Sequence, residues 1–253
     1  MDAYISEYSS YNKHIVYMFG PGCGGIGDFV KYFMIGLAHC IKHKIALHLF
    51  KKDTFLDQHI RLKFKCMYLD TLASSITLDG LHADILPDVY YTLAPYVLYP
   101  YDMDKSMPYG DVFTFSDIVI KTASTLPEQY TAVHLRLGDK YLETDKSFVL
   151  CKHDERKFDE EALFLVLQSP DVLFFCDNYS YKMKIKAKFP HVLVTEWPVG
   201  HTSLSNTTDE LAIFAVAEFY AMTKSAKIIA ASKSGFSETA ACFQPVLFEQ
   251  LSR

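Results

Sequence analysis

Short apolar runs that each end in a turn are the feature that most constrains the fold. Residues 14–19 lead into a glycine-dense turn at 20–28, residues 130–137 into Gly138-Asp139, and residues 227–231 into a Ser/Gly turn at 232–237. The chain between such runs has helical apolar spacing. Strands that alternate with helices predict an α/β architecture.

The same patterns assign the other elements. We expect further strands at residues 44–50, 172–176 and 191–195, and helices at 29–41, 53–68, 111–124, 159–168, 180–188 and 208–223. Residues 71–107, which several prolines interrupt, are expected to be irregular. Pro127 marks the expected boundary between two domains, residues 1–126 and 127–253.

Bulk composition excludes several classes of protein. Half of the 253 residues are hydrophobic, enough for one large or two small cores, and the formal charge of −5 provides no global cationic field for nucleic acid or an anionic membrane. The six cysteines are scattered without a Cys-x-x-Cys pair. This argues against a zinc site or a disulfide scaffold.

Neither a signal peptide nor a membrane span is visible in the sequence. The first 13 residues are polar and aromatic, and no uncharged apolar run reaches about 18 residues. We expect a cytoplasmic protein, as a bacterial or viral enzyme would be, or else a catalytic segment cut from a longer chain.

The segment Thr131–Tyr141 is the first candidate for a binding site. His134 and Arg136 are two residues apart, so they leave the same face of a strand where it opens into a loop. The planar fork of Arg136 suits a diphosphate, and His134 can add a donor beside it. The alternative is that Arg136 pairs with Asp139 in a structural turn and that His134 is a satisfied buried histidine.

Two further turns have the form of anion sites. In the first, Gly24, Gly25 and Gly27 would let backbone amides approach a ligand, although their spacing fits neither the dinucleotide nor the P-loop fingerprint. In the second, residues 232–237 offer hydroxyls and amides at a helix start. A tight turn without a ligand and a plain N-cap are the ordinary meanings of these two patterns.

Three blocks in this order resemble the fucosyltransferases that form α1,2, α1,6 and protein O-linked bonds from GDP-fucose. The central block, His-x-Arg-x-Gly-Asp-x-Tyr, begins at His134; Gly24 to Phe29 resemble the family's Gly-Gly-Leu-Gly-Asn-Gln; and Glu218, Met222, a short strand and Ser-Lys-Ser-Gly-Phe-Ser resemble its third motif. The departures include Asp28 for Asn, Phe29 for Gln and the inserted Gly235. Most of the intervening chain is unmatched.

The resemblance implies a GT-B-like fold of two Rossmann-type domains that face a cleft, with the acceptor glycan on the first domain and the GDP-sugar on the second. It implies inverting transfer of L-fucose from GDP-β-L-fucose, with no metal and no cofactor beyond the donor. Arg136 would stabilise the departing diphosphate, and Glu218 would bind ribose or guanine. Asp177 would either lie near the nucleotide or cap a helix. Gly24, Gly25 and Gly27 would also bind the donor. The diphosphate shell would be completed by His134, Ser232, Ser234 and the amides of Gly235, Phe236 and Ser237.

The acceptor hydroxyl also needs a base, for which the resemblance offers Glu143, then Asp145. Asp139 is a third candidate, with a bracing role as its alternative. We interpret Asp102-Met103-Asp104 as a loop and not as a metal motif. Two other functions stay open: a transferase for another nucleotide sugar, and a non-catalytic nucleotide- or glycan-binding protein of the same fold.

Overall fold

Two parallel sheets form the framework of the molecule. The computed structural model describes residues 1–20, 22–50, 55–103, 105–143, 151–202, 204 and 206–251. Within these residues each sheet has five strands, and a separate antiparallel pair joins β3 (Ile60–Leu62) to β7 (Phe113–Phe115). The fold is therefore α/β, as the sequence predicted.

The first sheet lies in the amino-terminal half, in the order β4-β2-β1-β6-β5, and all its neighbouring strands are parallel. The strands are β1 (His14–Tyr17), β2 (Ala46–Phe50), β4 (Tyr68–Leu69), β5 (Ile76–Thr77) and β6 (Tyr90–Leu93). The chain leaves β1 toward β2 on one side and returns to β6 on its other side. The strand order therefore reverses between β1 and β6.

The second sheet has the order β10-β9-β8-β11-β12 and is also parallel. Its strands are β8 (Thr131–Leu135), β9 (Val172–Cys176), β10 (Leu193–Val194), β11 (Lys227–Ala230) and β12 (Leu247–Gln250). Counted along the chain, this is the 3-2-1-4-5 arrangement of a nucleotide-binding half-sheet. Its order reverses between β8 and β11, where ligands bind in such sheets.

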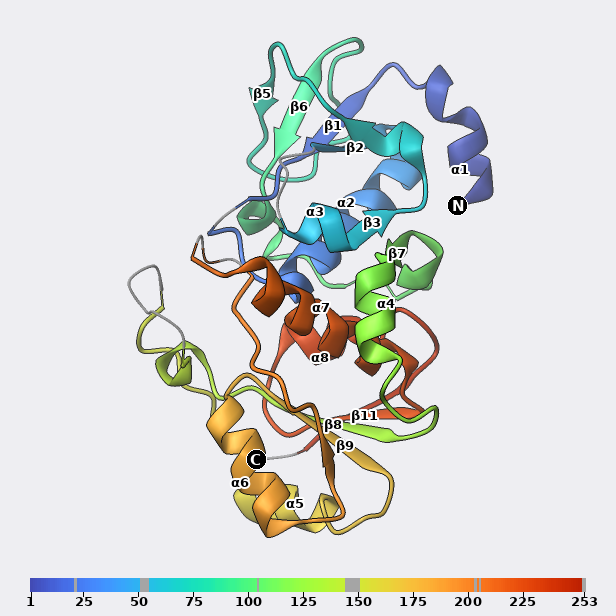
Figure 1. Cartoon of the computed structure of the whole chain (residues 1–253). Coiled ribbons are helices and arrows are strands. Elements are labelled where there is room, and N and C mark those ends of the chain that lie inside the picture. Colours follow the sequence, from blue (N-terminus) through green and yellow to red (C-terminus); the bar gives the residue numbers. More distant parts are fainter. Residues whose placement is uncertain are drawn as a thin grey trace.

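Helices cover both faces of the second sheet. In Figure 1, α7 and α8 lie between the two sheets, whereas α5 and α6 lie beyond the second sheet. The helices are α1 (Asp2–Glu7), α2 (Ile26–His43), α3 (Phe55–His59), α4 (Asp117–Ala123), α5 (Glu160–Val166), α6 (Tyr179–Lys188), α7 (Asp209–Lys224) and α8 (Gly235–Ala240). Short 3₁₀ turns are η1 (Tyr8–Ser10), η2 (Lys65–Met67), η3 (Pro95–Leu98), η4 (Tyr109–Asp111) and η5 (Asp139–Tyr141).

The hydrophobic core follows these layers. Along β8, Ala132 joins a large cluster that also includes the first sheet, whereas Val133 and Leu135 join a second cluster under α5 and α6. Alternate residues of one strand thus pack into two cores, as expected where both faces of a parallel sheet are covered. The large cluster spans both halves of the chain and α4 contacts α7, so the division at residues 126 and 127 stays a prediction.

Several predicted elements are confirmed, and others are wrong. The strand at 172–176 has its predicted bounds, and Thr208 caps α7 by accepting a hydrogen bond from the Leu211 amide. The predicted helix at 53–68 is wrong, because α3 ends at His59 and β3 follows with a buried, exposed, buried pattern that is typical of a strand. The helix expected at 111–124 begins only at Asp117, after β7.

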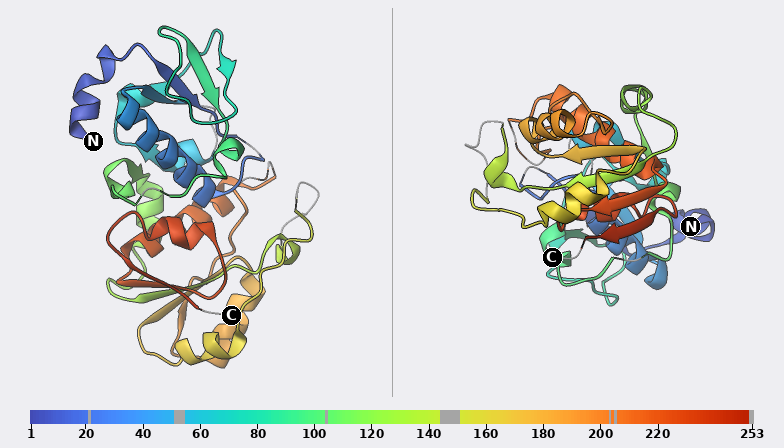
Figure 2. Two further views of the ribbon diagram at one scale, coloured as in Figure 1. Left: turned by 180° about the vertical axis from the view of Figure 1, so that it is seen from behind. Right: turned by 90° about the horizontal axis from the view of Figure 1, so that it is seen from below.

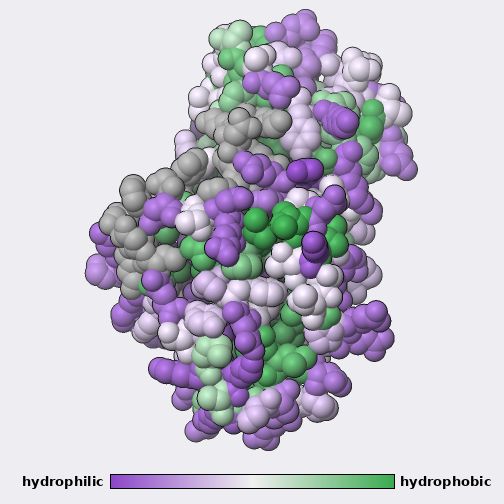
Figure 3. Space-filling model, viewed as in Figure 1, coloured by the Kyte–Doolittle hydropathy of each residue, from purple (hydrophilic) through white to green (hydrophobic). Residues whose placement is uncertain are grey.

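The region 71–107 is less irregular than expected, because it contains strand β5 and the interior strand β6, which pairs with both β1 and β5. The surface seen in Figure 3 is mostly hydrophilic, with hydrophobic residues gathered over α4 and α7 and lower down over β8 and β9. Searching the described residues reveals no helix with both the length and the apolar character needed to cross a bilayer. All six cysteines are described and are free thiols.

Candidate functional site

A cavity lies where the turn after β1 meets the carboxyl ends of β8 and β11. Its volume is about 590 Å³, within the ~300–1,000 Å³ typical of small-molecule sites. From the second sheet it is lined by His134, Arg136, Asp177 and Ser234, and from the first by the glycine turn and the start of α2. Both switch points of strand order therefore open into one cavity, and its lining brings together residues from all three sequence blocks.

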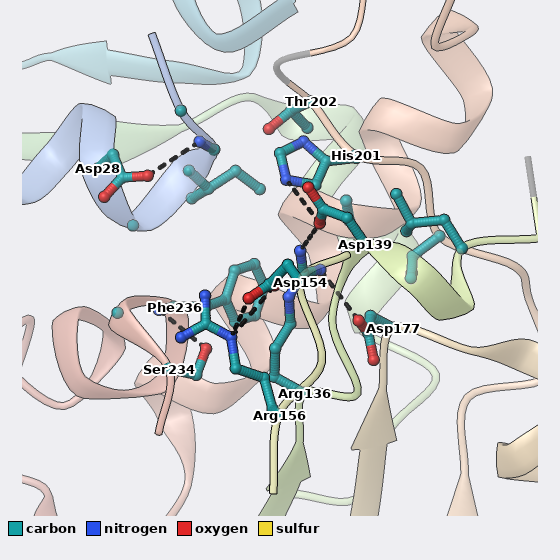
Figure 4. Close-up of a pocket in the computed structure, with 18 of the residues that line it drawn as sticks. Asp28, Arg136, Asp139, Asp154, Arg156, Asp177, His201, Thr202, Ser234 and Phe236 are labelled. Carbon is teal, nitrogen blue, oxygen red and sulfur yellow. Dashed lines mark hydrogen bonds and ion pairs between the residues drawn. The ribbon is translucent and has the colours of Figure 1, made fainter. Parts of the chain in front are cut away.

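Arg136 is held between two carboxylates. Its Nη1 lies 3.0 Å from Asp177 Oδ2, and its Nη2 donates to Asp139 Oδ1 (Figure 4). Only 19% of the side chain is exposed. The predicted pairing of Arg136 with Asp139 is thus present, and it lies inside a cavity. Two of the five guanidinium N–H donors make these contacts, which leaves others for a ligand.

Asp177 fixes the backbone of the same loop. Its carboxylate accepts hydrogen bonds from the amides of Leu137 (2.8 Å) and Gly138 (3.0 Å). The helix α6 that follows is capped by Asn178, which accepts from the Tyr181 amide. The capping role considered for Asp177 therefore belongs to Asn178. Asp177 lines the cavity, and its place near a nucleotide stays a prediction.

A second guanidinium, which sequence reasoning missed, also lines the cavity. Gly138 has a φ of +104°, and a Cβ there would lie 2.5 Å from the Asp154 carbonyl oxygen. This close approach lets the Arg156 amide donate to the Leu137 carbonyl, which brings Arg156 beside Arg136. Arg156 Nε lies 2.9 Å from Asp154 Oδ1. The glycine was the only sequence signal, because the charges at 154–157 read as a solvated stretch.

His134 is buried, and its ring packs on Phe236 at a centroid distance of 5.4 Å. Burial, and next the positive charge of Arg136, lower the pKa of His134 to about 3. Within the described residues its Nδ1 is buried and has no hydrogen-bond partner. The imidazole is therefore neutral near pH 7, so it can shape the cavity or make one hydrogen bond but adds no positive charge for a diphosphate.

Glu218 also lines the cavity, as part of a buried ion pair. Lys182 Nζ donates to Glu218 Oε1 (2.7 Å), to Thr195 Oγ1 (3.0 Å) and to the Trp197 carbonyl (2.8 Å), and the Thr195 hydroxyl donates to Glu218 Oε1 as well. Burial raises the pKa of Glu218, while the charge of Lys182 opposes the rise. Lys182 thus fixes the Glu218 carboxylate from the buried side.

The glycine turn forms the opposite wall. Gly24 has a φ of +109°, and the Gly25 amide donates to Asp28 Oδ2 at 3.2 Å at the start of α2. A Cβ on Gly27 would lie 2.7 Å from the Gly235 carbonyl oxygen, so the starts of α2 and α8 are in direct contact. Figure 2 shows this approach of the amino-terminal half to the carboxyl-terminal half from behind.

The Ser/Gly turn contributes only part of what was expected. Ser234, Gly235 and Phe236 line the cavity, but the Ser234 hydroxyl accepts from the Phe236 amide as the N-cap of α8. The predicted role of Ser232 in the diphosphate shell is wrong. Its hydroxyl accepts from the Arg136 amide (2.9 Å) and donates to the Arg136 carbonyl (2.7 Å), so it links β11 to β8. Ser237 is fully buried and does not line the cavity.

The residues expected to act as the base are placed differently from one another. Glu143 is outside the cavity lining, because its carboxylate accepts from the amides of Tyr179 (2.6 Å) and Ser180 (3.1 Å) at the start of α6. Asp139 lines the cavity and braces Arg136, which is the alternative role proposed for it. Asp145 lies outside the described residues.

His201, in the polar loop before α7, is a further lining residue that the sequence did not reveal. Its Nε2 lies 3.7 Å from Asp139 Oδ1, and the side chain is 16% exposed. Burial and the charge of Arg136 lower the pKa of His201, against the effect of Asp139. No periodicity marks a loop residue of this kind, so only the structure could find it.

Among the described residues, no group of three or more His, Cys, Asp or Glu side chains is arranged to hold a metal ion. Asp102 does not line the cavity, and Asp104 lies outside the described residues. The interpretation of Asp102-Met103-Asp104 as a loop stays a prediction.

Comparisons with known proteins give a likeness in structure and none in sequence. No protein-family model matches the chain, and no curated protein matches it. The fold is similar to that of a mutant of Arabidopsis thaliana FUT1 in complex with GDP, with a TM-score of 0.58 at 11% identity over 100% of this chain and 74% of that one.

Two further solved structures have the same fold. NodZ α-1,6-fucosyltransferase soaked with GDP-fucose gives a TM-score of 0.53 at 9% identity, covering 92% of this chain and 93% of that one. POFUT1 in complex with GDP-fucose gives 0.51 at 12% identity, covering 94% and 97%. At these identities the likeness shows the fold alone, which is the α/β fold of GT-B-like fucosyltransferases.

Proposed function

We propose that this protein is an inverting glycosyltransferase that moves L-fucose from GDP-β-L-fucose to a hydroxyl of a glycan. The observation that carries the proposal is Arg136, held by Asp139 and Asp177 at the end of β8 in a cavity that both sheets line. The fold likeness to structures solved with GDP or GDP-fucose supports the choice of donor.

Charge separation in the reaction explains the need for a fixed guanidinium. As the bond between C1 of the sugar and the phosphate oxygen breaks, the diphosphate becomes more negative, so donors fixed in advance contribute most at that moment. Asp139 and Asp177 hold Arg136 in place, but they also offset its charge. Arg156, with Asp154 as its ion-pair partner, supplies a second cation to the same cavity. With two guanidinium groups the proposed reaction needs no metal.

The proposed nucleoside end of the donor lies toward Glu218. The hydroxyls of ribose and the N–H edge of guanine both present donors, which a carboxylate accepts. Lys182 and Thr195 hold Glu218 from the buried side. A carboxylate fixed in this way would favour guanine over a base that presents only acceptors at the same place, which supports a GDP-sugar over other donors.

A panel of nucleotides tests the proposal. We expect GDP and GDP-fucose to raise the melting temperature of the protein, because a ligand that binds only the native state stabilises it by about 2.7 kcal/mol at 100 times its Kd. UDP-sugars should give smaller shifts. Release of GDP from GDP-fucose, with water or an added oligosaccharide as acceptor, then measures turnover.

Each alternative function has its own result in this panel. A larger shift with another sugar nucleotide would identify another donor. Binding of GDP-fucose without any release of GDP would identify a non-catalytic binding protein. Absence of binding by every guanine nucleotide would contradict the proposal itself.

A further inference from the structure

Five carboxylates line the cavity, and they differ in their partners. Asp139 and Asp177 pair with Arg136, Asp154 with Arg156, and Glu218 with Lys182. Asp28 is the exception: among the described residues no Lys, Arg or His nitrogen lies within ion-pair distance of its carboxylate, and the hydrogen bond that this carboxylate accepts there comes from the Gly25 amide to Oδ2. A carboxylate that is not committed to a cation is free to take a proton.

The position of Asp28 fits that role. It follows Gly27, whose backbone touches Gly235 at the start of α8, so Asp28 lies beside the contact between the two walls. Figure 4 shows it at the start of α2, apart from the group formed by Arg136, Asp139 and Asp177. If the diphosphate lies against Arg136, an acceptor hydroxyl must approach the sugar from the opposite side, which is the side of α2.

We propose that Asp28 is the general base of the transfer, an inference that rests on the proposed function. Its carboxylate takes the proton from the acceptor hydroxyl while the hydroxyl oxygen forms a bond to C1 of fucose. The bond from C1 to the phosphate oxygen breaks at the same time, and GDP leaves with the electron pair. Asp28 then returns the proton to solvent.

The electrostatic surroundings are consistent with a base. Burial raises the pKa of the Asp28 carboxyl, although the Gly25 amide and the charges of Lys31, Arg136 and Arg156 oppose the rise. A carboxyl near the start of a helix normally has a lowered pKa, so here burial outweighs the helix. Besides these cations, three phenols interact with this carboxyl, and they are neutral near pH 7: Tyr17, Tyr32 and Tyr99.

His201 is the rival for the same role. It lines the cavity and lies near Asp139, as a histidine base often lies near a carboxylate. However, burial lowers the pKa of His201, and the nearby charge of Arg136 lowers it further because it disfavours a second positive charge there. Asp28 becomes neutral when it takes the proton, so Arg136 and Arg156 oppose its protonation only from across the cavity.

The substitution Asp28→Asn separates a base from a helix cap. The amide oxygen of Asn can still accept from the Gly25 amide, so this hydrogen bond and the fold are kept, whereas the proton acceptor is lost. We expect GDP release from GDP-fucose, with water or lactose as acceptor, to fall about 10²–10⁴-fold, the usual contribution of a general base. GDP affinity by calorimetry should stay within threefold of wild type.

The pH profile gives a second readout. Wild-type kcat/KM should fall as pH falls through the raised pKa of Asp28, because the ionised carboxylate is the active form; Asp28→Asn should lose this limb and Asp28→Glu should keep it. Transfer by Asp28→Asn within threefold of wild type, or a loss confined to His201→Asn, would overturn the inference. If wild-type protein does not turn over GDP-fucose at all, the proposed function fails and the inference falls with it.

Discussion

The two walls of the cavity differ in how their carboxylates are used. On the wall formed by the second sheet, Asp139, Asp177 and Glu218 are ion-paired with Arg136 or Lys182. On the wall formed by the first sheet, the Asp28 carboxylate has a backbone amide, that of Gly25, as its hydrogen-bond partner among the described residues. A cation beside a carboxylate opposes its protonation and is itself fixed by it, whereas a carboxylate without such a partner takes a proton more readily. We therefore infer that the wall formed by the second sheet binds the diphosphate and that Asp28, on the wall formed by the first sheet, accepts the proton.

Breaking the most buried pair is the most severe way to test this contrast. Lys182→Met leaves Glu218 as an uncompensated charge, and removing one partner of a buried ion pair typically costs about 3–5 kcal/mol. Chemical denaturation should show this loss. Lys186→Met, on the same helix but in an exposed pair with Glu196, is the control and should change stability by less than about 1 kcal/mol. A double variant with Glu218→Leu should recover part of the loss.

Equal stability of Lys182→Met and Lys186→Met would show that the buried pair does not hold this wall. If instead Lys182→Met is destabilised but the double variant recovers stability without recovering GDP binding, then Glu218 has the proposed role in recognising the nucleoside.

Removing Arg136 unpairs two carboxylates at once. Arg136→Ala should lower turnover by about 10²–10³-fold, the usual effect of losing one fixed donor to a developing negative charge. Arg136→Lys keeps the charge but cannot bridge Asp139 and Asp177 as a fork does, so most of the loss should remain. Single-turnover kinetics with GDP-fucose measure both effects.

Arg156→Ala provides the comparison within the same wall. Arg156 has Asp154 as its ion-pair partner and a side chain 41% exposed, so its removal should cost only about tenfold, as for one charge-assisted hydrogen bond. A larger effect at Arg156 than at Arg136 would move the main diphosphate contact to Arg156.

The contact between the walls can be tested at a glycine. A Cβ at Gly27 would meet the backbone of Gly235 at 2.7 Å, so Gly27→Ala must push α2 and α8 apart, at a cost of about 1–3 kcal/mol for overpacking. Transfer should fall with it, because Asp28 moves relative to Arg136. Gly36→Ala, on the same helix, would meet only side chains at 3.7 Å or more, and it should be neutral or stabilising. Equal behaviour of the two variants would show that the walls are not in close contact.

The sequence predicted those elements that have local signals, and it missed those that depend on contacts between distant parts of the chain. Strand β9 and helix α7 were predictable because their apolar patterns and the Thr208 cap are local signals. The interior strand β6 was missed, because its tyrosine-rich residues lie among prolines and their strand structure depends on pairing with β1 and β5. The sequence predicted that the Ser232 hydroxyl would bind a ligand. It bonds instead to the backbone of Arg136, 96 positions away, and this contact depends on the pairing of β11 with β8.

The site follows the same rule. Arg136 was found because it ends a strand, but Arg156 and His201 lie on loops that reach the cavity through contacts distant in sequence. Asp28 was seen in the sequence only as a departure from the asparagine of the resembled motif. Its meaning depends on having no ion-pair partner among the described residues, which is a property of the fold and not of the local sequence.

Substitution of Glu143 has the smallest expected effect. This residue also shows that closeness in sequence to the arginine motif does not place a side chain in the cavity. It follows the arginine motif by a few residues, yet its carboxylate accepts from two amides at the start of α6 and so acts as a helix cap. Glu143→Ala should lower stability by about 0.5–2 kcal/mol, the usual cost of a lost cap, and leave transfer within twofold of wild type. Thermal denaturation and GDP release measured on the same preparation would test both parts. If Glu143→Ala lowered transfer as much as Asp28→Asn, Glu143 would be the better candidate for the base, and the proposed difference between the two walls would be wrong.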